Sequence, residues 1–219
     1  MHHKTQSNLV YPLIFFTGFI LYLFLNSQGR YIKQKPLTTS QDYPLSTKGT
    51  KPLVMKGGNP YIRALMRTIT ASEANVKQPY NVIYGGSLVD DLTRHPDRCI
   101  TIVSGPNKGN CSTAAGRYQM LNYVWHEKAT RYHPNPKGIL RWKKYSFEPE
   151  YQDAVVYAWL KDSNVWGVDL TQLLKEGKIK TVLRLLSPTW TSLGYGIETN
   201  SMSPYLPEIY QNMLQEELS

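Results

Sequence analysis

The sequence predicts an α+β domain, in which a small antiparallel sheet is inserted among helices, preceded by an N-terminal transmembrane helix. Three observations lead to this prediction. Residues 9–25 carry no charge, apolar residues recur at three- and four-residue spacing from residue 60, and short β-branched or aromatic segments separated by Gly and Asn turns occupy residues 80–117. With 219 residues, 41% of them hydrophobic, the chain is long enough for one domain with a sizeable core.

Residues 9–26 are predicted to form an uncleaved transmembrane signal anchor after a short N-terminal tail, residues 1–8. The 17 uncharged residues from Leu9 to Leu25 would make a helix of roughly 25 Å, which is at the lower limit for crossing a bilayer. A cleaved signal peptide is the alternative, but Leu25 would occupy a position of the cleavage site that requires a small residue. The basic residues after the run do not favour export of the C-terminal part by the positive-inside rule.

Residues 27–58 are predicted to be a flexible tether, because they are rich in Gln, Thr, Ser, Lys, Pro and Gly and show no periodic apolar pattern. The globular domain then covers residues 59–219. Residues 1–51 hold six Lys or Arg and one acid, which leaves nineteen Lys or Arg and fifteen acids for the rest of the chain. More than half of the excess positive charge therefore lies before the domain, and this argues against a nucleic-acid partner.

The first helix of the domain is predicted for residues 60–72. Pro60 suits its first turn, and an apolar stripe is formed by Ile62, Leu65, Met66 and Ile69. Glu73 ends this helix and precedes the sheet, so we expect it to face the groove between them. Partial desolvation in such a groove raises the pKa of a carboxyl group, as a general acid requires, whereas a solvated surface charge is the ordinary alternative.

The sheet is predicted from segments 80–84, 99–103 and 112–118, which are separated by Gly and Asn turns. Cys99 and Cys111 bracket the turn of a hairpin with a long loop, which can bring two side chains to disulfide distance. A disulfide is expected if the domain is exported, and two buried thiols are the alternative. The sequence indicates no metal site and no cofactor. Further helices are predicted for residues 121–132, 148–161, 170–176, 179–186 and 204–217.

A series of motifs follows along the predicted domain, and the order and spacing of the whole set are specific. The motifs are ASEANVKQPY around Glu73, YNVIYGG from Tyr80, HP at His95, STAAGRYQML from Ser112, QDAV from Gln152 and WTSLGYG from Trp190. Together they resemble the phage lambda lysozyme (lambda endolysin) family of the lysozyme-like superfamily. The resemblance covers roughly residues 60–215 and implies a lysozyme-like fold and peptidoglycan lytic transglycosylase activity.

This resemblance implies that Glu73 is the catalytic acid. It would protonate the oxygen of the β-1,4 bond between N-acetylmuramic acid and N-acetylglucosamine, and then accept the proton of the muramic C6 hydroxyl as that hydroxyl attacks C1 to form a 1,6-anhydro end. A hydrolytic lysozyme, which needs a second carboxylate, is the enzyme alternative, with Asp91 in that role. A cell-wall-binding module without activity is the alternative from another class of protein.

The resemblance also implies a set of substrate-binding residues: Ser72, Tyr80, Asp91, Gly116, Tyr118, Gln119 and Tyr195. We expect Gln119 to bond sugar hydroxyl or acetamido groups and Tyr118 to stack on a sugar ring. Packing is the alternative for Tyr80, Tyr118, Gln119 and Tyr195, a plain turn for Gly116, and bonding at the helix end for Ser72. The expected partners are peptidoglycan glycan strands and, through residues 9–26, a membrane, with the catalytic domain on the periplasmic or cell-wall side.

Overall fold

The computed structural model describes four stretches of the chain, residues 50–103, 107–138, 144–196 and 200–219. The predicted anchor, residues 9–26, lies outside the described residues, as does most of the predicted tether. Within the four stretches, no helix has both the length and the apolar character needed to cross a bilayer.

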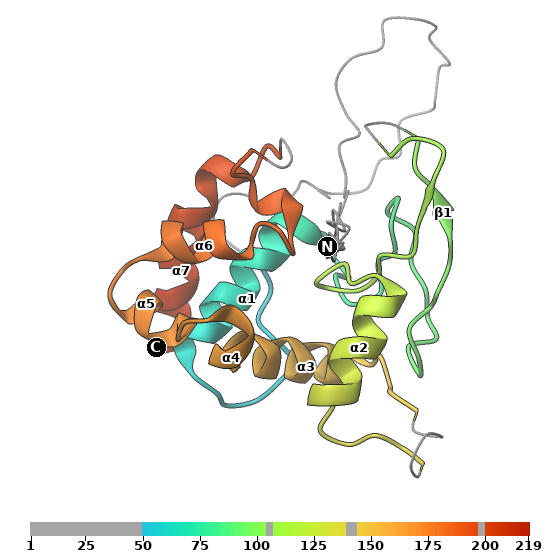
Figure 1. The fold of residues 1–219 in the computed structure, drawn as a ribbon, viewed down its shortest axis with the longest axis horizontal. Coiled ribbons are helices and arrows are strands. Elements are labelled where there is room, and N and C mark those ends of the chain that lie inside the picture. Colours follow the sequence, from blue (N-terminus) through green and yellow to red (C-terminus); the bar gives the residue numbers. More distant parts are fainter. Residues whose placement is uncertain (1–49, 104–106, 139–143, 197–199) are drawn as a thin grey trace, which may run out of the picture.

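The described residues form an α+β fold, as predicted. The α-helices are α1 (Pro60–Glu73), α2 (Asn122–Tyr132), α3 (Pro149–Lys161), α4 (Ser163–Trp166), α5 (Leu170–Lys175), α6 (Ile179–Leu186) and α7 (Leu206–Leu218). The 3-10 helices η2 (Thr191–Leu193) and η3 (Ser203–Tyr205) lie between α6 and α7. Figure 1 shows α1 in the middle of the helical part, while β1 and its hairpin extend on the side away from α5, α6 and α7.

Helix α1 is the central element of the fold. The side chain of Asn59 caps its start by accepting hydrogen bonds from the backbone N–H groups of Tyr61 and Ile62, at 3.0 and 3.4 Å, and Pro60 occupies the first turn. Every residue from Ala64 to Glu73 is buried. The prediction for this helix is confirmed, and its buried C-terminal end brings Glu73 into the interior of the domain.

The sheet is smaller than the sequence predicts. Strands β1 (Ile100–Thr101) and β2 (Cys111–Ser112) pair antiparallel, and the predicted strand over residues 80–84 makes only isolated bridges, Val82 to Leu88 and Ile83 to Ala115. The chain turns sharply at Gly85 and Gly86, both at positive φ, which prevents a longer ladder. The disulfide between Cys99 and Cys111 is present, with the two Cα atoms 5.3 Å apart.

Residues 50–58 fall in the range predicted as a tether, yet in the structure they pack on the domain. Thr50 donates a hydrogen bond to the carbonyl of Arg67 at 3.0 Å, and the guanidinium of Arg117 donates to the carbonyls of Lys51 and Pro52 at 2.5 and 3.1 Å. Leu53 belongs to the hydrophobic core. The folded part of the chain therefore includes Thr50. Because these bonds use backbone carbonyls, residue composition gave no indication of them.

Candidate functional site

Glu73 lies at the end of α1 with 5% of its surface exposed. Its Oε1 atom accepts a hydrogen bond from the hydroxyl of Ser192 in η2. The Ser192 hydroxyl also lies 3.0 Å from that of Ser72, which in turn lies 3.0 Å from the carbonyl oxygen of Ile69. We refer to Ser72, Glu73 and Ser192 as the Glu73 cluster. It joins the end of α1 to a turn more than a hundred residues later in the chain.

The segments on either side of Ser192 fix its position. The carbonyl of Ser192 accepts a hydrogen bond from the hydroxyl of Ser203 at 3.0 Å. Gly194 has a φ of 95°, and a Cβ atom there would lie 3.0 Å from the Ser203 side chain, so a larger residue would disturb this contact. Asn200 donates to the carbonyl of Ser72 at 3.3 Å. The end of α1 is thus closed by the chain around η2 and η3.

A second buried carboxyl, that of Asp153 in α3, has a different environment. Its Oδ2 accepts from the Tyr80 hydroxyl at 2.7 Å and from the backbone N–H groups of Val54 and Met55 at 2.8 and 3.1 Å. Its Oδ1 accepts from the Tyr118 hydroxyl at 2.6 Å. Burial, and then the nearby Asp153 carboxyl, raise the pKa of Tyr118 well above its ordinary value, so this phenol remains a donor.

Arg117 and Gln152 extend this network, and with Tyr80, Tyr118 and Asp153 they form what we refer to as the Asp153 cluster. The Arg117 guanidinium is fully buried and donates to the hydroxyls of Thr70 and Tyr80 at 2.8 and 3.1 Å. The side-chain oxygen of Gln152 accepts from the backbone N–H of Arg117 at 2.9 Å. Its amide donates to the carbonyls of Tyr80 and Phe147 at 3.0 and 2.8 Å. These bonds join α1, α3 and the sheet region.

Gly116 is required by the packing around Gln152. Its φ is 74°, and an added Cβ atom would lie 2.2 Å from Oε1 of Gln152 and 2.7 Å from the ring of Phe147. The next turn places Gln119 at a φ of 44°, where its buried amide donates to the carbonyls of Val82 and Gly116 at 3.2 and 2.9 Å. In this structure the Gln119 amide therefore bonds one carbonyl of its own turn, that of Gly116, and one of a distant segment, that of Val82.

The predicted substrate-binding residues thus separate into three groups. Ser72 lies beside Glu73, while Tyr80, Tyr118, Gly116 and Gln119 belong to the Asp153 cluster or border it. Asp91 and Tyr195 are exposed, and none of the hydrogen bonds of the two clusters involves either residue. Trp190 connects the two clusters, because its indole N–H donates to the carbonyl of Tyr118 at 3.1 Å, directly before η2.

Asp91 and Tyr195 have side chains that reach solvent. The Asp91 carboxyl accepts from the backbone N–H and hydroxyl of Thr93 at 2.9 and 2.6 Å, and these two bonds lower its pKa. Tyr195 is 40% exposed and has a φ of 61°, with the Arg184 guanidinium 5.3 Å from its ring centroid. Both side chains are accessible to a large ligand.

Sequence reasoning did not single out Ser192 or Asp153. Both lie inside motifs that carried the resemblance, WTSLGYG and QDAV, but neither sits in a spacing typical of a catalytic or ligand-binding residue. Asp153 stands among apolar residues of α3, where an acid that is fully buried is rare without partners. An acid placed among apolar residues was therefore the one indication in the sequence that Asp153 is hydrogen-bonded inside the domain.

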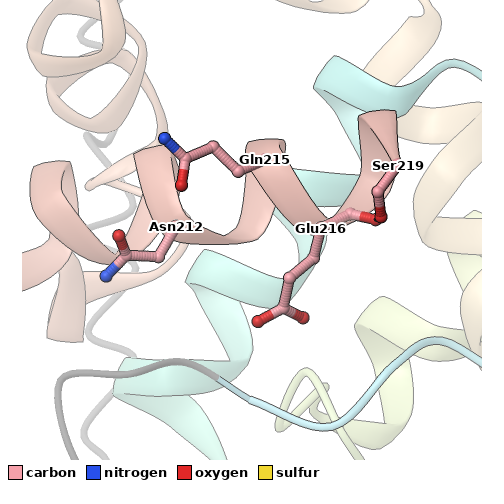
Figure 2. A pocket seen from close by; sticks show the side chains of 4 residues that line it. All are labelled: Asn212, Gln215, Glu216 and Ser219. Atoms are coloured by element: carbon pink, nitrogen blue, oxygen red, sulfur yellow. The ribbon is translucent and has the colours of Figure 1, made fainter.

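A surface hollow on α7 is separate from both clusters. It is lined by Asn212, Gln215, Glu216 and Ser219, whose side chains Figure 2 shows along the last turns of the helix. Glu216 also forms an ion pair with Arg67 of α1 at 2.5 Å. Among the described residues, no three His, Cys, Asp or Glu side chains are grouped so as to hold a metal ion.

Comparison with known proteins gives a consistent set of similarities. The family model described as Endolysin matches residues 63–215. The endolysin of Escherichia phage lambda is 32% identical over 120 residues, which cover 53% of this chain and 64% of that protein, a little less than two thirds of its length. A structure of bacteriophage lambda lysozyme complexed with a chitohexasaccharide has a TM-score of 0.54 at 27% identity, covering 73% of this chain and 97% of the other. Another structure, of lysozyme from bacteriophage lambda, has a TM-score of 0.52 at 25% identity, with coverages of 74% and 97%.

Proposed function

The chain belongs to the endolysin family, and from this premise we propose that it is a peptidoglycan lytic transglycosylase whose general acid and base is Glu73. The observation that carries the proposal is the buried Glu73 carboxyl, which ends α1 and is bonded by the hydroxyl of Ser192. A carboxyl largely removed from water can hold a proton for transfer to a leaving group.

The proposed reaction needs one carboxyl group. Glu73 gives its proton to the bridging oxygen as the bond between that oxygen and C1 of N-acetylmuramic acid breaks. The C6 hydroxyl of the same sugar forms the new bond to C1 and returns its proton to Glu73, which leaves a 1,6-anhydro end. No water is consumed, so the reaction needs no second carboxylate at a defined distance, unlike hydrolysis.

A glycan substrate is supported by the similarity to a lambda lysozyme that was solved with a chitohexasaccharide. Of the residues predicted to bind substrate, Tyr195 and Asp91 have the exposure that contact with a glycan strand requires. We propose that Tyr195 stacks on a sugar ring and that Asp91 bonds sugar hydroxyl groups. Tyr80 and Tyr118 then act as supports, because their hydroxyls donate to Asp153.

Mass analysis of digested peptidoglycan tests the proposal. The wild-type protein is expected to release muropeptides that end in the anhydro form, and Glu73→Gln is expected to release none above background. Ends heavier by one water would instead assign the protein as a hydrolytic lysozyme. Binding to peptidoglycan without cleavage, by both proteins, would assign it as a cell-wall-binding module.

We also propose that residues 9–26 anchor the chain in a membrane and hold the domain on the periplasmic or cell-wall side, because the charge-free run from Leu9 to Leu25 is long enough to span a bilayer. The full chain is then expected to stay with the membrane fraction after alkaline carbonate extraction. Protease added outside the inner membrane should digest the tether. Full release of the intact chain by carbonate would contradict the anchor.

A further inference from the structure

The hydroxyl groups beside Glu73 form a continuous chain. Ser192 Oγ contacts Glu73 Oε1 on one side and lies 3.0 Å from Ser72 Oγ on the other. Ser72 Oγ also lies 3.0 Å from the carbonyl oxygen of Ile69. A hydroxyl group has one proton to donate and can accept two hydrogen bonds, so the chain has more than one arrangement of protons on the same heavy atoms.

Two arrangements satisfy the chain, and they differ in the protonation of Glu73. With Glu73 ionised, Ser192 donates to Oε1 and Ser72 donates to Ser192. With Glu73 protonated, its O–H donates to Ser192, Ser192 donates to Ser72, and Ser72 donates to the carbonyl of Ile69. Each change of charge on Glu73 is thus matched by rotation of two hydroxyl groups, and no heavy atom needs to move.

We propose that Ser192 is a positioning residue of the transglycosylase reaction. When the proton on Oε1 of Glu73 passes to the bridging oxygen of the substrate, Ser192 rotates and donates to the Oε1 atom that has lost it, and Ser192 rotates back when the C6 hydroxyl returns a proton. The Glu73 carboxyl therefore stays in one place while it changes from acid to base. The inference rests on the proposed function, because only a reaction that uses both forms of Glu73 needs a partner able to serve both. A fixed N–H donor would stabilise the carboxylate alone.

The surroundings of Ser192 suit this role. Its side chain is fully buried, so a bulk water molecule does not take its place. Its backbone is held by the hydrogen bond from Ser203 at 3.0 Å and by the turn at Gly194. Ser192 follows Trp190 and Thr191, both of which are buried. The hydroxyl therefore has a fixed origin and freedom about a single bond, which the reversal requires.

The test measures kcat and KM on soluble, uncross-linked glycan strands of alternating N-acetylmuramic acid and N-acetylglucosamine. Ser192→Ala is expected to lower kcat about 10- to 100-fold, the effect of one lost hydrogen bond to a charged group, with KM within about two-fold of the wild type. Ser192→Thr, which retains the hydroxyl, is expected to recover most of kcat. Ser187→Ala is the matched control, because Ser187 is also buried but donates to the carbonyl of Arg184 at 2.8 Å.

The second arm combines Ser192→Ala with Ser72→Ala. Since Ser72 acts on Glu73 through Ser192, the double variant is expected to lose no more kcat than Ser192→Ala alone. If the losses of kcat from the two single variants added in the double variant, Ser72 would not act on Glu73 through Ser192, and the proposal would be overturned. If Ser192→Ala does not fold, Ser72→Ala carries the test, with an expected loss of kcat at unchanged KM, and wild-type kcat in that variant would overturn the proposal.

The outcomes separate this inference from the proposed function. A wild-type protein that releases no anhydro ends would contradict the proposed function itself. A wild-type protein that releases them, together with a folded Ser192→Ala variant whose kcat stays within about two-fold of wild type, would contradict only the role of Ser192.

Discussion

The Glu73 and Asp153 clusters each surround a buried carboxyl group, but the groups that bond the two carboxyls are of different kinds. Asp153 accepts from two backbone N–H groups, which can only donate, and from two phenol hydroxyls. Glu73 accepts from a serine hydroxyl that is itself part of a rotatable chain. A backbone N–H group stabilises the carboxylate alone, whereas a hydroxyl group can also accept from a protonated carboxyl. Both carboxyls are buried, so burial alone does not separate the proposed acid, Glu73, from Asp153, whereas the backbone N–H donors to Asp153 and the serine hydroxyl chain at Glu73 do.

The clusters also differ in what they connect. The Asp153 cluster binds the backbone of residues 51–55 and joins α1 to α3, so its bonds hold separate parts of the domain together. The Glu73 cluster joins the end of α1 to a single turn. The indole of Trp190 bridges them through its bond to the carbonyl of Tyr118. We infer that the Asp153 cluster is the frame on which the turn carrying Ser192 is placed.

The largest expected effect is on activity, from Glu73→Gln. Glutamine has the same shape and can accept the Ser192 bond, but it cannot give a proton, so release of muropeptides is expected to fall by roughly 10³-fold or more. The melting temperature, followed by circular dichroism, is expected to stay near that of the wild type. Turnover close to wild type in the variant would contradict the assignment of Glu73 as the reacting acid.

Asp153→Ala is expected to have the opposite pattern. It removes the acceptor of the buried Tyr80 and Tyr118 hydroxyls and of the Met55 backbone N–H, while the Val54 N–H keeps the Tyr80 hydroxyl as an acceptor. The free energy of unfolding is expected to fall by about 3 kcal/mol or more in urea titrations. Asp91→Ala is the matched control, because Asp91 is exposed and bonded only locally to Thr93, and the urea midpoint of that variant is expected to stay unchanged. Equal urea midpoints for the two variants would contradict the proposal that the Asp153 cluster stabilises the fold.

The sequence predicted most of the helices because their apolar residues recur with helical spacing. The helix predicted for residues 60–72 placed Glu73 at its end, and in the structure Glu73 is the last residue of α1. The sequence did not predict α4 or η2, because a helix of one turn has no repeat to detect. Ser192 lies in such a turn, so its contact with Glu73 could not be found from the sequence.

The bonds of the Asp153 cluster could not be predicted from the sequence, for another reason. Tyr80, Tyr118 and Gln119 were predicted to bind substrate, with packing as the alternative, and the structure bonds all three internally. The donors from Val54 and Met55 are backbone groups, which residue identity does not reveal. Which aromatic side chain is buried depends on the packing of distant segments, and a single sequence does not specify that packing.

Acid is expected to lower the stability of the folded domain through His95. Its Nε2 lies 2.9 Å from the carbonyl of Met120, the N–H of Asp97 donates to Nδ1 at 3.1 Å, and the ring packs edge-on against Phe147. Burial is the main cause that lowers the pKa of His95 to about 4. Between pH 6.5 and 4 the unfolded chain then binds a proton that the folded chain does not, so stability falls as the pH falls, by about 1.4 kcal/mol per pH unit.

Urea unfolding at pH 6.5 and pH 4.5 measures how much His95 contributes to the pH dependence of the free energy of unfolding. The wild type is expected to lose about 2 kcal/mol more than His95→Gln between the two pH values, because the variant has no imidazole to protonate at that position. The comparison is between the changes with pH, so any constant effect of the substitution cancels. An identical pH dependence in both proteins would show that His95 is not the group responsible.

The smallest expected effects come from two tyrosines that the sequence treated alike. Tyr118→Phe removes one of the four donors to Asp153, so the free energy of unfolding is expected to fall by about 1 to 2 kcal/mol, while kcat and KM of the folded protein stay unchanged. Tyr195→Ala is expected to raise KM several-fold, because a stacking surface is lost, with little change in the melting temperature. If Tyr118→Phe instead raised KM at unchanged stability, Tyr118 would be a substrate contact. It would then belong with the residues of the reacting site and not with those that support Asp153.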